Sequence, residues 1–154
     1  MLNRIHQIGH WIKSCGRFFL RSGQAASKLT LGPAGERLAA KFLQRQGYRI
    51  VARSHRQRLG EIDLIAIDQG CLVFVEVKTW TSDHAGDPSE AVDRRKQEKL
   101  TRAALVYLKQ RQLLEQPARF DVISIVWPLQ AGEQPAIRHF KNAFEAVGHG
   151  QMFR

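Results

Sequence analysis

Two apolar strand patterns, each interrupted by charged residues, constrain the fold of this chain more than any other feature. They are residues 60–65, Gly-Glu-Ile-Asp-Leu-Ile, and residues 73–78, Val-Phe-Val-Glu-Val-Lys. Asp68-Gln69-Gly70 between them has turn chemistry, so the pattern predicts two adjacent antiparallel strands. Because an unpaired charge is costly to desolvate, charged side chains inside such strands indicate a functional site or a buried ion-pair network.

The turn between these strands decides which charged side chains meet. Alternation along a strand places Glu61 and Asp63 on one face of the first strand. If residues 69–70 form a two-residue loop, Asp63 lies opposite Glu76, with about 5 Å between the opposed Cβ atoms. The same register sets Glu61 opposite Lys78, an attractive pair. A three-residue loop with a glycine bulge would shift this register, so the convergence of the carboxylates depends on the turn.

The residue types at this point suit phosphodiester hydrolysis. Two carboxylates as close as those of Asp63 and Glu76 repel each other unless a cation lies between them. Hard cations such as Mg²⁺ or Mn²⁺ prefer carboxylate oxygens, and a backbone carbonyl next to Glu76 could be a third ligand. Such an ion lowers the pKa of a bound water, and Lys78 could orient that water or stabilise the transition state. Glu36, in an expected helix, could reach the same ion through water or bind a second one.

Structural interpretations of the same residues stay open. Glu61 and Lys78 could form one pair of a buried ion-pair network, which need not be functional. Asp63 could form another pair with an arginine such as Arg56. Lys96 lies on the apolar stripe of a later expected helix. Its ammonium could extend to the site and contact a phosphate, or it could snorkel to solvent.

The charge balance favours a polyanionic partner. The chain has 24 Lys and Arg against 14 Asp and Glu, a formal net charge of +10. An excess of this size is typical of proteins that bind DNA, RNA or an acidic membrane surface. Residues 94–102 form a basic cluster on an expected helix, either a solvated face or a footprint for the DNA backbone. The residues expected to contact nucleic acid are Lys96, Arg94, Arg95 and Arg56.

The order of predicted elements indicates one α/β domain over residues 32–154. Of the 154 residues in the whole chain, 44% are hydrophobic, which suffices for one core. A helix is expected at 33–46, opened by Pro33 and ended at Gly47. Three strands follow at 48–54, 61–68 and 71–79. A second helix, capped by Ser89, is expected at 90–109, and two strands at 119–127 and 137–140.

Residues 1–31 are interpreted as a basic extension whose apolar residues recur at helical spacing. It could be a packed or solvated amphipathic helix, a contact for nucleic acid or membrane, or disordered. No run approaches the ~18 apolar residues of a membrane helix. Two cysteines without metal or disulfide spacing favour a reducing compartment, so we expect a cytoplasmic protein. His55 and His84 are expected at the surface.

Several ordered blocks of the sequence resemble the YraN-like family, which is similar to the restriction-endonuclease-like PD-(D/E)xK superfamily and its archaeal Holliday-junction resolvases. The resemblance covers about residues 34–145. The blocks are Ala34-Gly35-Glu36-x-x-Ala39, Gly47-Tyr48, residues 60–66, residues 73–78, Pro88-x-Glu90-Ala91-Val92-x-x-x-Lys96 and Asn142-Ala143-Phe144.

This resemblance implies a restriction-endonuclease-like mixed central β-sheet flanked by helices, with an α-β-β-β-α-β core. It matches Asp63, Glu76 and Lys78 to the metal and catalytic positions. It matches Glu36 to the acid of the first helix. The sequence departs from the family pattern at Arg53-Ser54, at Trp80 and at residues 85–86, which are positions where substrate would be held.

Together these observations predict a divalent-metal-dependent endonuclease that hydrolyses phosphodiester bonds in DNA, with branched or structured DNA as a candidate substrate. A homodimer would present two such centres to two strands. Two rival interpretations stay open. One is a non-catalytic nucleic-acid-binding module that retains the fold. The other is a membrane- or protein-docking component that acts through residues 1–31.

Overall fold

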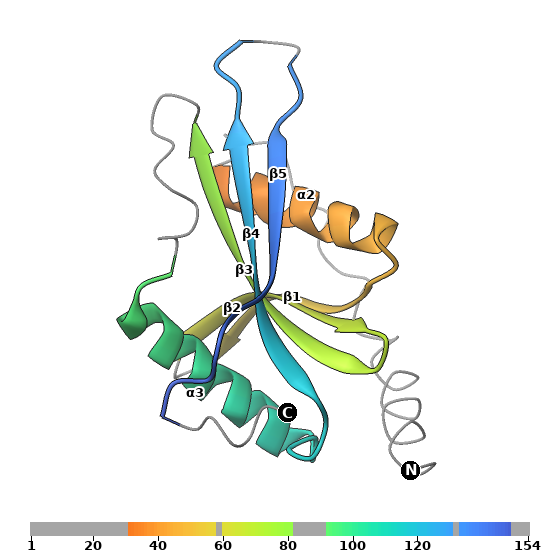
Figure 1. Ribbon diagram of the computed structural model, residues 1–154, viewed down its shortest axis with the longest axis vertical. Coiled ribbons are helices and arrows are strands. Elements are labelled where there is room, and N and C mark those ends of the chain that lie inside the picture. The colour runs from red at the N-terminus through yellow and green to blue at the C-terminus, as the bar shows by residue number, and fades with distance from the viewer. Residues whose placement is uncertain (1–30, 58–59, 82–91, 131–132, 149–154) are drawn as a thin grey trace.

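The computed structural model describes residues 31–57, 60–81, 92–130 and 133–148. Within these ranges the chain forms two helices and five strands (Figure 1). In chain order they are α2 (Leu31–Arg45), β1 (Arg49–Gln57), β2 (Gly60–Asp68), β3 (Cys71–Thr81), α3 (Arg94–Gln110), β4 (Ala118–Trp127) and β5 (Ala136–Phe144). The expected extension, residues 1–31, lies outside the described residues except for Leu31.

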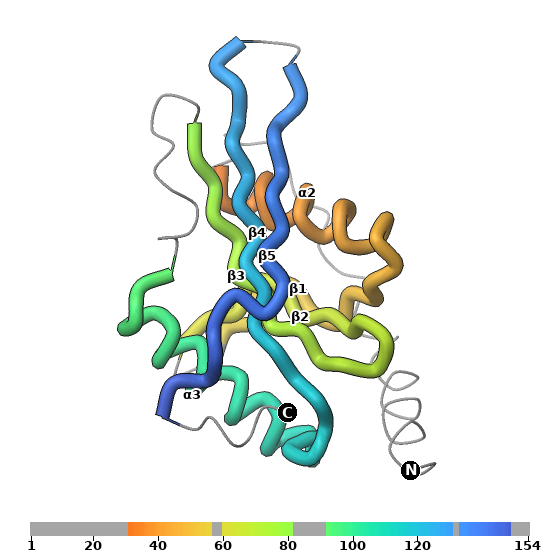
Figure 2. Tube along the Cα trace, in the orientation of Figure 1, coloured from red at the N-terminus to blue at the C-terminus, as the bar shows by residue number. Residues whose placement is uncertain are grey.

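The five strands form one mixed sheet in the order β1-β2-β3-β4-β5. Only the β3–β4 pair is parallel, and its connection contains α3. The tube in Figure 2 shows β3, β4 and β5 extending together past α3, on the side of the molecule away from the β2–β3 turn. The predicted α/β architecture, a mixed central sheet flanked by helices, is confirmed. Among the described helices, none has the length and apolar character needed to cross a membrane.

Each helix covers a different face of the sheet, and we name the faces after them. On the α2 face, α2 packs on alternate residues of β2, β3 and β4: Ala39, Ala40 and Leu43 meet Leu64, Ala66, Val73, Val75, Ile123 and Ile125. On the α3 face, Leu100, Ala103, Ala104, Tyr107 and Leu108 meet the residues in between, among them Ile65, Phe74 and Phe120. The period-2 pattern of the strands therefore buries both faces.

The β2–β3 turn has the geometry that sets the predicted register. Gln69 and Gly70 have φ values of 48° and 86°, as the two central residues of a type I′ turn require. Asp68 pairs with Cys71, and the ladder continues to Leu64 opposite Val75. The two-residue loop is therefore confirmed, and the three-residue alternative is wrong.

Both helices begin at residues other than those predicted. α2 starts at Leu31, two residues before Pro33, which therefore lies in the first turn, where a missing N–H leaves no hydrogen bond unmade. α3 starts at Arg94, not near residue 90. Its N-cap is Asp93, whose carboxylate accepts a hydrogen bond from the Lys96 N–H at 2.7 Å. The expected cap, Ser89, lies outside the described residues.

A buried ionic network, which the sequence did not predict, joins β4 to β5 and to the end of β2. The Asp121 carboxylate, fully buried, accepts from Arg119 Nε and the Asn142 N–H and contacts His139 Nε2, each at 2.9 Å. Arg119 also donates to Asp68 at 2.8 Å. The β4–β5 register shifts at this point, so the carboxylate fills a bulge in β5. β5 consequently runs to Phe144, beyond the predicted end at residue 140.

Candidate metal centre

The two predicted acids lie where β2 and β3 separate. The β2–β3 ladder stops at the pair Leu64–Val75. One residue further on, Asp63 Oδ2 accepts a hydrogen bond from the backbone N–H of Val77 at 2.7 Å. This side-chain hydrogen bond takes the place of the next backbone pair of the ladder. It holds the Asp63 carboxylate against the stretch of β3 that carries Glu76.

Both carboxylates lie on the α3 face. Asp63 alternates with Ile65, which pairs with Phe74, and Glu76 alternates with Phe74 in turn. Burial and the negative charge of Glu76 raise the pKa of Asp63 to about 7, against smaller opposing effects of the Val77 N–H and Lys96. At neutral pH the Asp63 carboxyl is therefore about half protonated.

One carboxylate oxygen of Glu76 has two cationic partners, and the other has none among the described residues. The residue is only 4% exposed. Its Oε1 lies 3.2 Å from Lys78 Nζ and 3.0 Å from Lys96 Nζ. Its Oε2 is buried and receives no hydrogen bond from any residue in the described ranges. Buried polar atoms almost always have a partner, so this oxygen is a candidate ligand for a cation or a water.

Lys96 reaches the site from the first turn of α3. Its ammonium contacts Glu76. The side chain therefore extends to the site, as one of its two predicted conformations requires, and does not snorkel to solvent. The N-cap residue Asp93 accepts a hydrogen bond from the backbone N–H of Lys96. The cap therefore fixes the backbone position from which the lysine side chain extends. Contact of Lys96 with a phosphate stays a prediction.

Glu36 approaches the centre from α2 and is held by a residue that the sequence did not single out for this role. Ser54 Oγ donates to Glu36 Oε2, although the two residues are 18 positions apart in the chain. The negative charge of Glu36 contributes to the raised pKa of Asp63. Nothing local in the sequence indicates this bond, because it depends on how α2 lies over β1.

The donor set fits a hard divalent cation through two carboxylates, not three. Asp63 and Glu76 offer carboxylate oxygens, the ligands that Mg²⁺ and Mn²⁺ prefer. One of these oxygens is buried and has no hydrogen-bond donor among the described residues. Across the described parts of the chain, no three His, Cys, Asp or Glu side chains lie together closely enough to hold a metal ion. A contact of Glu36 with the ion, direct or through water, therefore stays a prediction.

Comparison with known proteins assigns the chain to a family. The model of the uncharacterised protein family UPF0102, the YraN family, matches residues 35–125. The chain belongs to this family. The matched span contains Glu36, Asp63, Glu76, Lys78 and Lys96, so every residue of the candidate centre lies within the part that defines UPF0102.

Curated UPF0102 proteins from several bacteria are similar to this chain. One from Rhodopirellula baltica is 41% identical over 154 residues, covering 95% of this chain and 92% of the relative. One from Geobacter metallireducens is 48% identical over 116 residues, covering 75% and 93%. One from Symbiobacterium thermophilum is 53% identical over 95 residues, covering 62% and 80%. The resemblance predicted from the sequence blocks is confirmed, while the family name states no activity.

The expected structural ion pairs of the UPF0102 chain are not the ones observed. Glu61 pairs with Arg56 at 2.9 Å, not with Lys78, and Asp63 does not pair with Arg56. The physical reason is that β1 and β2 stay in register at Arg56 and Glu61, whereas β2 and β3 have already separated. Lys78 is thereby left to Glu76.

The remaining predicted contact residues lie on the surface of the UPF0102 fold. Arg94 and Arg95 are exposed on α3, where Arg94 lies 3.8 Å from Glu98. Their contact with nucleic acid, like that of Arg56, stays a prediction. His55 was expected at the surface, but it is half-buried with its ring 5.1 Å from that of Tyr107. Burial and Arg111 lower the pKa of His55. His84 lies outside the described residues.

Proposed function

We propose that this UPF0102 protein is a divalent-metal-dependent endonuclease that hydrolyses phosphodiester bonds in DNA. The observation that carries the proposal is the pair of carboxylates, Asp63 and Glu76, brought together on one face of adjacent strands beside two lysine ammonium groups. The buried Oε2 of Glu76, without a donor among the described residues, is the position where a cation would be held.

In this mechanism Asp63 and Glu76 would hold Mg²⁺ or Mn²⁺. The bound ion would act as a Lewis acid on the scissile phosphate and lower the pKa of a water molecule. Asp63 gives up its carboxyl proton before it can serve as a ligand, because its pKa is about 7.

The two lysines have complementary tasks in the proposed reaction. Without substrate, Lys78 and Lys96 both neutralise Glu76 Oε1. With Asp63 and Glu76 Oε2 holding the cation, the two ammonium groups beside Oε1 would be available to the phosphate. Lys78, two residues beyond Glu76 on the same face of β3, then orients the attacking water or stabilises developing negative charge. Lys96 binds a non-bridging phosphate oxygen from the α3 side.

DNA is the proposed substrate because the chain is strongly basic and the site is flanked by exposed arginines. The net charge is +10, and Arg94 and Arg95 extend from the helix that also supplies Lys96. Such residues bind the phosphate backbone irrespective of sequence. Branched or otherwise structured DNA, a homodimer and a cytoplasmic location belong to the same proposal.

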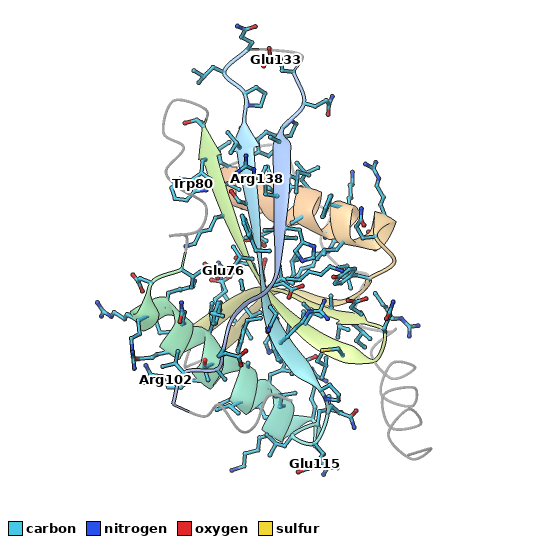
Figure 3. The ribbon with its side chains drawn as sticks, in the orientation of Figure 1. Glu76, Trp80, Arg102, Glu115, Glu133 and Arg138 are labelled. Atoms are coloured by element: carbon cyan, nitrogen blue, oxygen red, sulfur yellow. The ribbon has the colours of Figure 1, made fainter. Side chains whose placement is uncertain are left out.

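The deciding experiment measures cleavage and metal binding on the same variants. Wild type should cleave at least one of linear, flapped and four-way DNA with Mn²⁺, and calorimetry should detect Mn²⁺ binding. Glu76→Gln and Asp63→Asn should each lose at least ~100-fold in cleavage rate and lose Mn²⁺ binding. Glu115→Gln, an exposed acid far from Glu76 in Figure 3, is the matched control and should behave as wild type. Wild type that cleaves none of these substrates contradicts the proposal.

A non-catalytic DNA-binding module is the second candidate, and one observation favours it. Glu76 Oε1 already has two ammonium groups as counter-charges. A site that serves only as an ionic network predicts DNA binding with no Mn²⁺ uptake and no effect of Asp63→Asn on affinity. The same calorimetry and cleavage assays therefore separate the two candidates.

A further inference from the structure

The α3 face of the sheet continues beyond the carboxylates as a row of polar side chains across three strands. Lys78 of β3 is level with Ser124 of β4, and Ser124 lies opposite Arg138 of β5. Residues paired across strands share a face, so all three side chains lie on the same face as Glu76. Their neighbours in sequence point the other way: Val77, Ile123 and Ile137 belong to the core on the α2 face.

Three buried polar atoms on this face lack a partner within the described residues. They are Glu76 Oε2, Ser124 Oγ and Trp80 Nε1. Ser124 is 1% exposed and lies at the floor of the row, between the two longer cationic side chains. Buried polar groups without a protein partner indicate that water or a ligand supplies their partners.

The charge and position of the row specify the chemistry of that ligand. Arg138 is exposed, and no acid in the described ranges forms an ion pair with it. Lys78 stands at the other end, about 10 Å away across two strand spacings. Figure 3 shows Trp80 and Arg138 together over the extended halves of β3 to β5, beyond Glu76 and α3. Two cations on one face of the sheet suit an anion such as a backbone phosphate.

We propose that Arg138 binds a second backbone phosphate of the DNA strand, next to the scissile phosphate held at Asp63 and Glu76. This inference rests on the proposed DNA-cleaving function and extends it. The strand then crosses the sheet from β3 toward β5, along Lys78, Ser124 and Arg138. Arg138 is a binding residue in this arrangement and takes no part in the proton transfers.

The salt dependence of DNA binding tests this contact directly. In EDTA, where the substrate is not cleaved, the slope of log Kd against log salt concentration reports how many phosphates are neutralised, at about 0.9 per phosphate on duplex DNA. Arg138→Ala should lower the slope by about that amount and weaken binding about tenfold at low salt. Arg45→Ala, which removes another exposed arginine, from α2, is the control for net charge and should keep the slope.

A chemically neutral phosphate identifies which linkage is bound. One methylphosphonate is placed on either side of the scissile bond in turn. One of the two should weaken binding to wild type but have no further effect on Arg138→Ala, because protein and DNA then lack the same contact.

The possible results distinguish failure of the second phosphate site from failure of the endonuclease proposal. An unchanged slope for Arg138→Ala, or equal methylphosphonate effects on both proteins, overturns the second phosphate site. DNA binding without Mn²⁺-dependent cleavage overturns the endonuclease proposal, and the slopes still decide the role of Arg138. Wild type that binds no DNA overturns both.

Discussion

The Asp63 carboxyl is the residue whose protonation state couples the stability of the protein to metal binding. Its pKa is about 7 in the folded protein and near 3.8 when unfolded. Between these two values the folded state binds more protons, so stability falls as pH rises through this window and stays reduced above pH 7. The ionised carboxylate is thus a destabilising feature kept at the site, as expected of a group with a function.

Asp63→Asn should therefore stabilise the metal-free protein at high pH. The amide oxygen can still accept from the Val77 N–H, while the buried charge is gone. In EDTA at pH 8 we expect the variant to be more stable by ~1–2 kcal/mol, a gain of about 2–4 °C per kcal/mol in melting temperature. The gain should vanish near pH 4, where wild type is also protonated. Thermal melts at both pH values check this, and a pH-independent difference would contradict it.

Glycine at position 35 determines how closely α2 lies on the sheet. A Cβ built on Gly35 would come within 2.1 Å of Thr79 Cγ2, so the helix backbone rests directly on β3. This contact places the next residue, Glu36, at the height of Ser54 and the candidate centre. An element-level packing contact therefore sets the position of a predicted site residue.

Gly35→Ala should destabilise the protein although alanine favours helices. The propensity gain is about 1 kcal/mol, whereas overpacking a close contact costs ~1–3 kcal/mol and displaces α2. Denaturant unfolding should show the loss, together with weaker Mn²⁺ binding if Glu36 assists the ion. The matched control is the double variant with Thr79→Ser, which removes the clashing Cγ2 atom. Restored stability in the double variant is expected, and its absence would refute the contact.

Among the helices and strands, the features that the sequence predicted correctly depend on residues close together in the chain. Gln69 and Gly70 fix their turn and hence the register that puts Asp63 beside Glu76. The start of α3 was wrong because Ser89 and Asp93 are both good N-caps, and sequence alone does not choose between them. The partner of Glu61 was wrong because the point where two strands separate depends on packing from both sides.

At the scale of the whole molecule, two of the missed features depend on β5. Its register beside β4 sets Arg138 level with Ser124, and its bulge admits the Asp121 carboxylate. Neither could be predicted, because β5 is an edge strand whose burial alternates weakly and whose pairing has no tight turn to fix it. The metal ligands, by contrast, lie on a hairpin whose register is set within a few residues.

The Asp121 network should hold this distant part of the sheet in place. Burial acts to raise the pKa of Asp121, but hydrogen bonds from His139, Arg119 and the Asn142 N–H outweigh it and keep the pKa below its usual value. The network therefore contributes stability above the unfolded pKa, near 3.8, and loses it as pH falls through the lower folded pKa.

Asp121→Asn should cost ~3–5 kcal/mol at pH 7, because it removes a fully buried carboxylate and leaves the partly buried guanidinium of Arg119 with only Asp68 as a counter-charge. Denaturant unfolding measures the loss, and hydrogen exchange should locate it in β4 and β5. If Arg138 depends on the register of β5, the same variant should also lower the salt slope of DNA binding while Mn²⁺ binding at Asp63 and Glu76 persists. A variant that loses both properties together would show that the network supports the entire sheet and not β5 alone.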